Sequence, residues 1–309
     1  MIDINKSRLD KLDGFLSPDR IISLFVKRDD LIHEEVSGNK WRKLKYNIEL
    51  CQSRKNKGVL TFGGAYSNHL VATAAACKEM GLESIGFVRG DELKENSNDT
   101  LKRCVEFGMK LIFISREEYR LKNEKAYQEG LSLDYPNFHI VPEGGANYYG
   151  MIGCQEIITE IKEDIDHVFV SQGTATTSCG ILLALEPHQQ LHVVPALKGY
   201  ESEAEMRALI GKSGIEPAWT EELLSQVEVL NQYHFGGYGK CTEELFAFMR
   251  MVYNQVGFKL DPVYTGKAFF GMFKELENRS YDNSNVLFVH TGGIQGIHGV
   301  EQRMKTLIY

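Results

Sequence analysis

The sequence lacks the features that mark secreted, membrane-spanning or metal-binding proteins. Its six cysteines lie far apart and none belongs to a CxxC pair, which argues against a disulfide framework and against a zinc site. No run approaches the roughly 18 apolar residues that cross a bilayer. The first residues, MIDINKSRLDKLDGF, contain no apolar segment typical of a secretory signal. We therefore expect reduced, mostly buried thiols, no metal, and a cytoplasmic location.

Long basic runs and nucleotide-binding fingerprints are also missing. Lys and Arg total 35 against 42 Asp and Glu, a net charge of −7, so neither nucleic acid nor a membrane is an expected partner. No GxGxxG follows the first predicted strand and no GxxxxGK[ST] occurs, which counts against a nucleotide-dependent dehydrogenase. What is present is a chain of 309 residues, 43% hydrophobic and 25% charged, long enough for one large or two medium domains.

Short β-rich runs alternate along the chain with longer amphipathic stretches. Strands are predicted at 58–64, 83–90, 110–115, 138–145, 167–173, 191–199 and 286–293. Helices are predicted at 67–81, 97–107, 117–131, 148–163, 176–185 and 295–307, and another by the spacing of Leu245, Met249, Val252 and Val256. This alternation predicts an α/β fold with mainly parallel open sheets and helices on both faces.

Several predicted strands end in glycine and are followed by polar residues. Gly63-Gly64, Gly173 and Gly292-Gly293 are examples. Each alone is explained by a tight turn. In open α/β sheets, however, ligands bind beyond the carboxyl ends of strands, so the set together favours a ligand cleft.

The segment SGNKWRK (37–43) is the first candidate for chemistry. Lys40 follows a turn-favouring triplet and opens a predicted helix. Like charge on Arg42 and Lys43, together with the helix N-terminus, should disfavour its ammonium form and make it an imine-forming nucleophile. A solvated basic helix face is the alternative.

Two further loops connect a strand to a helix. In GGAYSNH (63–69) the backbone amides, Ser67 and Asn68 could bind a carboxylate or a phosphate, although Ser67 could equally be a simple helix cap. In SQGTATTSCG (171–180) the hydroxyls around Gly173 suit a phosphate monoester, and a helix start rich in Ser and Thr is the alternative. Tyr238 and Tyr264, each in a glycine-containing loop, are candidates for proton transfer or for packing at a domain boundary.

Taken in order, SGNKWRK, FGGAYSNH, PEGGAN, SQGTATTSCG, HFGGYGK, DPVYTGK and FVHTGG resemble the 1-aminocyclopropane-1-carboxylate (ACC) deaminase / D-cysteine desulfhydrase family. This family belongs to the fold-type II enzymes that use pyridoxal 5′-phosphate (PLP) and is related to the tryptophan synthase β subunit. The resemblance runs over nearly the whole chain.

The resemblance implies a role for each matching residue. Lys40 corresponds to the lysine that binds PLP covalently and moves protons at the substrate carbon. The residues implied in cofactor binding are Lys40, Lys43, Asn68, Gly173, Thr174, Ala175, Thr176, Thr177, Thr265 and Thr291. Those implied in substrate binding or catalysis are Lys40, Ser67, Asn68, His69, Tyr238 and Tyr264.

The resemblance also implies architecture and assembly. Residues 1–44 and 148–309 would form a larger PLP-binding domain, and residues 45–147 a smaller inserted α/β domain, with PLP in the cleft between them. Relatives are homodimers, so a homodimer is expected here.

Two positions bear on the substrate. ACC deaminases tend to carry glutamate where this chain has Thr265 and leucine where it has Thr291. A neutral hydroxyl supports the protonated pyridine ring less strongly than a carboxylate does. Both positions resemble the D-cysteine desulfhydrase branch, whose elimination asks less of the cofactor than ring opening. ACC deamination is the first alternative, a racemase the next, and a non-catalytic binder of a phosphorylated ligand the alternative of another class. His69 stands where many relatives have glutamine.

Overall fold

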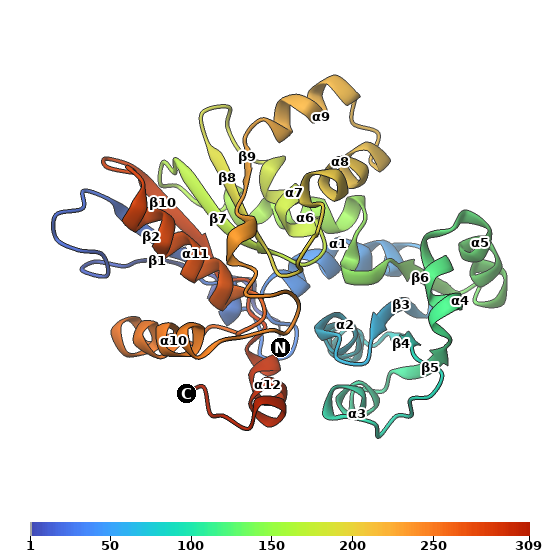
Figure 1. The fold of residues 1–309 in the computed structure, drawn as a ribbon. Coiled ribbons are helices and arrows are strands. Elements are labelled where there is room, and N and C mark those ends of the chain that lie inside the picture. Colours follow the sequence, from blue (N-terminus) through green and yellow to red (C-terminus); the bar gives the residue numbers. More distant parts are fainter. Residues whose placement is uncertain (1) are drawn as a thin grey trace.

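The computed structural model describes residues 2–309, which form two sheets with helices packed around them (Figure 1). The larger sheet has the strand order β1-β2-β10-β7-β8-β9, and its neighbours are parallel except for β1 and β2. Its strands are β1 (Leu9–Lys11), β2 (Ser23–Lys27), β7 (His167–Gln172), β8 (Gln190–Pro195), β9 (Val227–Val229) and β10 (Asn285–Val289).

The smaller sheet is parallel throughout and has the order β5-β4-β3-β6. Its strands are β3 (Gly58–Gly64), β4 (Glu83–Arg89), β5 (Lys110–Ile114) and β6 (Phe138–Val141). Two sheets that are parallel in all but one pairing confirm the predicted α/β fold. The strands of the smaller sheet are continuous in sequence, whereas those of the larger sheet come from both sides of them. The predicted domain boundaries, with 45–147 inserted between 1–44 and 148–309, stay a prediction.

The helices follow the strands in the expected alternation. They are α1 (Asn39–Ser53), α2 (Asn68–Glu79), α3 (Asp99–Glu106), α4 (Arg116–Arg120), α5 (Lys125–Asp134), α6 (Tyr148–Thr159), α7 (Thr176–Leu182), α8 (Ser202–Lys212), α9 (Pro217–Leu224), α10 (Glu243–Val256), α11 (Thr265–Asn278) and α12 (Ile297–Met304). Short 3₁₀ turns cover Ile4–Lys6, Asp29–Leu31, Leu121–Asn123, Glu143–Gly145, Asn231–Tyr233 and Ile294–Gly296.

The prediction of one continuous helix over 117–131 is wrong. The charged segment 117–131 is divided between α4, a 3₁₀ turn and α5. Glu124, just before α5, has an extended backbone (φ −77°, ψ 133°), which interrupts the helical hydrogen-bond ladder. The strands β1, β2 and β9 and the helices α8 and α9 were not predicted.

Apolar side chains pack on both faces of the larger sheet. Alternate residues of β10 divide between two clusters, as the pleat of a strand requires. Val286 and Phe288 pack in the cluster that contains α10 and α11. Leu287 and Val289 pack in the cluster that contains α6 and α7. Helices therefore cover both faces, as the sequence predicted.

The cysteine side chains are unpaired. All six cysteines are free thiols, five of them buried and Cys241 half-buried. No helix within residues 2–309 is long and apolar enough to cross a membrane. Over the same residues, no cluster of three or more His, Cys, Asp and Glu side chains is arranged to hold a metal ion.

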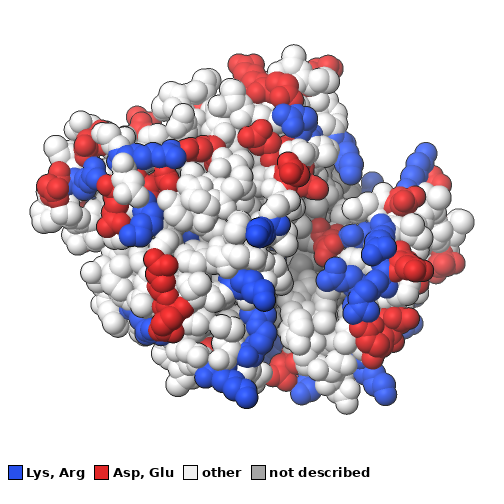
Figure 2. Space-filling view, viewed as in Figure 1, with Lys and Arg blue, Asp and Glu red and all other residues white. Residues whose placement is uncertain are grey.

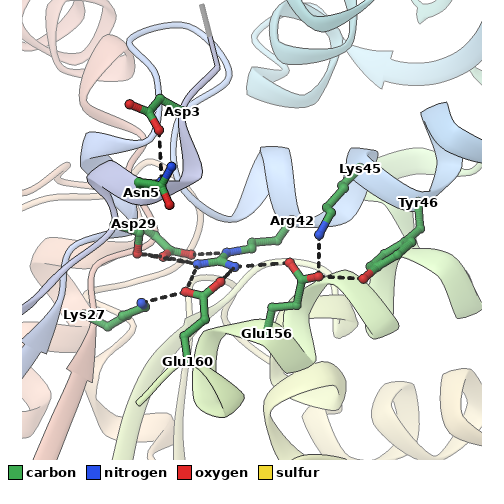
Figure 3. A network of polar contacts seen from close by, with 10 residues as sticks. Asp3, Asn5, Lys27, Asp29, Arg42, Lys45, Tyr46, Glu156 and Glu160 are labelled. Carbon is green, nitrogen blue, oxygen red and sulfur yellow. Dashed lines mark hydrogen bonds and ion pairs between the residues drawn. The ribbon is translucent and has the colours of Figure 1, made fainter. Parts of the chain in front are cut away.

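A buried ion network holds α1 against the larger sheet (Figure 3). The guanidinium of Arg42, which has no exposed surface, donates to both oxygens of Asp29 at 3.1 and 3.0 Å and to both oxygens of Glu160 at 2.6 and 2.8 Å. Lys27 of β2 adds an ion pair to Glu160 at 2.7 Å. Burial opposes the charge of Arg42, but the hydrogen bonds with Glu160 and Asp29 raise its pKa, so it stays a cation. The network ties α1 to β2 and to the end of α6.

The backbones of α1 and α6 also approach each other closely. A Cβ at Gly153 of α6 would lie 1.8 Å from the carbonyl oxygen of Arg42. Only glycine fits there, so the two helices meet with little room for adjustment.

Replacing Arg42 tests how much the fold depends on this network. Arg42→Met leaves the Asp29 carboxylate buried without its cation, so we expect the free energy of unfolding to fall by about 3–5 kcal/mol. Lys45→Met is the matched control, because Lys45 lies in the same helix and pairs at 2.5 Å with a partly exposed Glu156. That control should cost no more than about 1 kcal/mol. Urea unfolding measures both, and equal losses would contradict the special role of Arg42.

Candidate active site

A cavity of about 920 Å³ opens between the two sheets. Each sheet with its helices is called a lobe below, the smaller lobe being that of the sheet β5-β4-β3-β6. Figure 2 shows the hollow between the two lobes. Its wall is formed by the start of α1, the loops after β3, β4 and β7, α4 with the 3₁₀ turn that follows it, the turn at Glu143–Gly144, and segments around Leu197, Tyr238, Tyr264 and Thr291–Gly293. The loops after β3 and β7 leave the carboxyl ends of parallel strands, where the sequence predicted a cleft.

Lys40 lies on this wall because α1 begins beside the loop after β10. Gly38 has φ +59°, and a Cβ there would lie 2.0 Å from the carbonyl oxygen of Thr291. A glycine is therefore required for α1 to start so close to that loop. The Lys40 ammonium donates to Asn39 Oδ1 at 2.7 Å, and Asn39 Nδ2 donates to Thr177 Oγ1 at 2.8 Å. Asn39 thus links the lysine to the loop after β7, a role that the sequence reasoning missed.

The environment of Lys40 favours its neutral amine. Burial, helped by the nearby Lys43, lowers its pKa to about 7, while Asp261 opposes the shift. The predicted contribution of Arg42 is wrong, because its guanidinium is directed into the ion network with Asp29 and Glu160. Burial, which the sequence could not reveal, is the larger cause.

The hydroxyl-rich loop after β7 borders the same space. Gly173, Thr174 and Thr177 line the cavity, whereas Ala175 and Thr176 are buried behind it. Lys43 Nζ lies 3.4 Å from Thr174 Oγ1, and the Thr174 and Thr176 hydroxyls are 3.2 Å apart. A buried lysine beside several hydroxyls provides donors suited to a phosphate.

The loop after β3 faces Lys40 from the smaller sheet. Ser67 and Asn68 both line the cavity. Ser67 is also the N-cap of α2, since its Oγ accepts from the Leu70 amide at 3.4 Å. A Cβ at Gly63 would lie 2.7 Å from Ser67 Oγ, so the turn needs glycine at this point. The two readings of Ser67, cap and ligand contact, are therefore compatible.

His69 is held in one tautomer. Thr61 donates its hydroxyl hydrogen to the Val141 carbonyl, so the His69 Nε2–H must donate to Thr61 Oγ1, 2.8 Å away. His69 Nδ1 then carries only a lone pair, and it has no partner among the described residues. Burial lowers the pKa of His69 to about 3, with Lys40 and Lys43 adding to the effect. This buried histidine on the cavity wall is a neutral acceptor.

Tyr238 and Tyr264 meet at the cavity in an edge-to-face contact, with ring centroids 6.1 Å apart. Burial raises the pKa of Tyr264 well above its usual value, and Tyr238 and Asp261 add to the shift. Tyr264 is therefore a protonated phenol that can donate a hydrogen bond but is a poor base. A Cβ at Gly173 would lie 2.9 Å from the Tyr264 ring, so the tyrosine packs directly on the loop after β7.

The two threonines differ in position. Thr291 lines the cavity, and its hydroxyl lies 3.3 Å from that of Ser171. Thr265 is fully buried behind the wall, where its hydroxyl donates to Asp261 Oδ2 at 2.7 Å. Asp261, which sequence reasoning missed, also accepts the backbone amides of residues 263, 264 and 265 and so orders the chain beside Tyr264. A carboxylate three residues before a tyrosine carries no signal of this role in the sequence.

Comparisons with known proteins agree with this geometry. The model of the pyridoxal-phosphate dependent enzyme family matches residues 7–292. A protein of Pyrococcus horikoshii that carries the provisional name 1-aminocyclopropane-1-carboxylate deaminase is 32% identical over 92% of this chain and 89% of its own. The bifunctional D-cysteine desulfhydrase/1-aminocyclopropane-1-carboxylate deaminase of Arabidopsis thaliana is 29% identical over 92% of this chain and 76% of its own.

A crystal structure described as an ACC deaminase homologue superposes with a TM-score of 0.78 at 27% identity, covering 97% of this chain and 93% of that one. It supports the two-sheet, fold-type II architecture.

The residues present fit the cofactor of this family. An aldehyde needs an amine that is partly neutral, and Lys40 is one; a phosphate needs hydroxyls and a cation, and the loop after β7 with Lys43 supplies them. The cavity has room for both the cofactor and an amino acid. The chain therefore belongs to the pyridoxal-phosphate-dependent enzyme family, as a homologue of ACC deaminases and D-cysteine desulfhydrases.

Proposed function

We propose that this enzyme catalyses β-elimination from D-cysteine or a similar small amino acid, giving pyruvate, sulfide and ammonia. The observation that carries the choice is the neutral character of the cavity wall around Ser171 and Thr291. The carboxylates on the described wall, Glu92 and Glu143, belong to the smaller lobe. Asp261 lies behind the wall and already accepts hydrogen bonds from three backbone amides and Thr265.

A neutral wall favours the less demanding reaction. PLP, when bound, delocalises the electrons left on the substrate carbon, and a carboxylate beside its ring nitrogen strengthens this effect. Hydroxyls of Thr291 and Ser171 support it less. Elimination begins with removal of an α-proton and expels a good leaving group, whereas opening the ring of ACC must proceed without an α-hydrogen. The first reaction therefore suits this site better.

The chain's own residues divide the work. In the proposal, Lys40 would hold the cofactor and, as a neutral base, would remove the α-proton of the substrate. Lys43 and the hydroxyls of the loop after β7 hold the phosphate, and Asn68 contacts the cofactor ring. Ser67 and the amides at the start of α2 hold the substrate carboxylate.

The remaining residues orient the substrate. Tyr264, a protonated phenol, donates to the departing side-chain group, and Tyr238 packs against it. His69 lies beside this site as a neutral, buried side chain whose Nδ1 has no partner among the described residues. A homodimeric assembly is part of the same proposal.

ACC deamination is the alternative, and the name carried by the Pyrococcus relative favours it. Its products would be 2-oxobutanoate and ammonia. A non-catalytic phospholigand binder fits less well, because such a protein has no need of a buried amine with a lowered pKa facing two tyrosines.

A product assay separates these activities. With added PLP we expect sulfide and pyruvate from D-cysteine and a kcat/KM at least about tenfold lower for 2-oxobutanoate from ACC. L-cysteine and D- and L-serine complete the panel. Release of 2-oxobutanoate from ACC without sulfide from D-cysteine would refute the choice of D-cysteine that rests on the neutral wall.

Removing the Lys40 amine should abolish turnover. We expect Lys40→Ala to lower kcat by at least about 10³-fold, because both the covalent anchor and the base are lost. PLP should still bind through the loop after β7, but the absorbance of the lysine-bound cofactor near the visible edge should vanish. Lys45→Ala, in the same helix but paired with Glu156, is the control and should retain activity. Wild-type turnover by Lys40→Ala would remove Lys40 from the mechanism.

Tyr264→Phe isolates the phenol hydroxyl. We expect kcat to fall about 10²-fold while PLP binding, followed by fluorescence titration, changes little. Tyr238→Phe is the matched comparison, since the Tyr238 ring contacts the ring of Tyr264 but is half exposed. An unchanged kcat for Tyr264→Phe would return this residue to a packing role.

A further inference from the structure

The smaller lobe presents positive charge to the cavity. The cations on this part of the wall are Arg89 at the end of β4, Arg116 and Arg120 of α4, and Lys122 of the following turn. Lysine and arginine side chains gather beside the groove on this lobe in Figure 2. Among the described residues, two carboxylates, Glu92 and Glu143, share the wall with these four cations. The cavity mouth is thus locally positive although the chain carries a net charge of −7.

Two of the four cations are paired within the wall. Arg116 Nη2 lies 2.5 Å from Glu92 Oε1, and Lys122 Nζ lies 3.4 Å from Glu143 Oε2. These pairs satisfy both carboxylates and leave no acid for the remaining two arginines.

Arg89 and Arg120 are the cations without an acid. Across residues 2–309, neither side chain forms an ion pair or donates a hydrogen bond. Arg89 lies over the ring of Tyr119, 5.6 Å from its centroid, and Lys122 contacts the same ring at 4.6 Å. The buried ring gives Arg89 a fixed support without neutralising it.

The position of Arg89 is set by the register of the smaller sheet. Arg89 pairs with Gly64 across β3 and β4, and its Nη2 lies 3.5 Å from where a Cβ of Gly64 would stand. Gly64 opens the loop that leads to Ser67. An unpaired guanidinium therefore stands at the edge of the loop to which the proposed function assigns the substrate carboxylate.

We propose that Arg89 and Arg120 bind an anionic group on the side chain of the amino-acid substrate, either a carboxylate or a phosphate. The inference rests on the proposed function and narrows its substrate class. Guanidinium groups offer paired N–H donors that match such oxyanions. D-cysteine is then a small substrate that leaves this subsite empty, and the preferred substrate carries the anion on its β-leaving group.

S-(carboxymethyl)cysteine is a suitable probe, since elimination with one water gives pyruvate, ammonia and mercaptoacetate. The bond between Cβ and sulfur breaks, its electron pair leaves with sulfur, and the α-proton goes to Lys40. S-(carbamoylmethyl)cysteine is the isosteric neutral control, because an amide replaces the carboxylate. Both compounds are used in D and L forms.

The holoenzyme should favour the anionic compound by about tenfold in kcat/KM, mainly through KM. The double variant Arg89→Gln/Arg120→Gln should bring this ratio near one. Arg116→Gln is the control, because it removes the same charge from the same wall but takes a guanidinium already paired with Glu92. It should keep most of the preference. A ratio in the double variant equal to that of the wild type would overturn the proposal. If kcat/KM also fell by the same factor for both compounds, the result would mean that Arg89 serves the α-carboxylate.

A binding measurement separates this proposal from the proposed function. If neither compound is turned over, calorimetry with PLP-loaded Lys40→Ala, which cannot consume them, compares the two dissociation constants. Tighter binding of the anionic compound that depends on Arg89 and Arg120 would retain the subsite while refuting elimination. Equal dissociation constants would refute the subsite whatever the enzyme catalyses.

Discussion

The position of the reactive lysine depends on one buried cation two residues away. Arg42 is bound by Asp29, in the 3₁₀ turn after β2, and by Glu160, the C-cap of α6. The first turns of α1 therefore cannot rotate or slide without breaking charge-assisted hydrogen bonds in the interior. Removing one partner of such a network costs several kcal/mol, far more than the loss of a surface pair. A helix so fixed presents Lys40 to the cavity at a constant place.

The same helix also separates two kinds of cation. Arg42 is compensated by carboxylates and its pKa is raised, whereas burial lowers the pKa of Lys40 and of Lys43, neither of which forms an ion pair with a carboxylate among the described residues. Lys40 can then act as nucleophile and base, and Lys43 is free to meet an anion brought by a ligand. Three basic residues within four positions thus differ in charge state according to which acids the fold places beside each one, as the proposed division into structure, chemistry and binding requires.

Much of this arrangement could be predicted from the sequence, because its signals are local. Buried strands that end in glycine, such as Gly58–Gly64 followed by the Ser67 cap, can be recognised from about a dozen consecutive residues. Contacts that depend on how distant elements meet could not be predicted. The direction of Arg42 depends on Asp29 and Glu160, which lie 13 and 118 residues away. The break at Glu124 and the hydrogen bonds of Asp261 are likewise invisible to periodicity and composition.

The two walls of the cavity carry different chemistry, and this division has a consequence for specificity. The larger sheet and α1 contribute Lys40, Lys43, the hydroxyls after β7 and Thr291, all of them suited to the cofactor. The smaller lobe contributes Ser67, His69 and the cations at the ends of β4 and α4. In the proposals above, a substitution at Arg89 or His69 would alter contacts with the substrate without touching the ion network that fixes Lys40. In the proposed function, Asn68 is the residue of the smaller lobe that meets the cofactor, and Tyr238 and Tyr264 meet the substrate from the other side. Substrate choice could therefore change at Arg89 or His69 while most cofactor contacts are preserved, which is how one fold can accommodate several amino-acid chemistries.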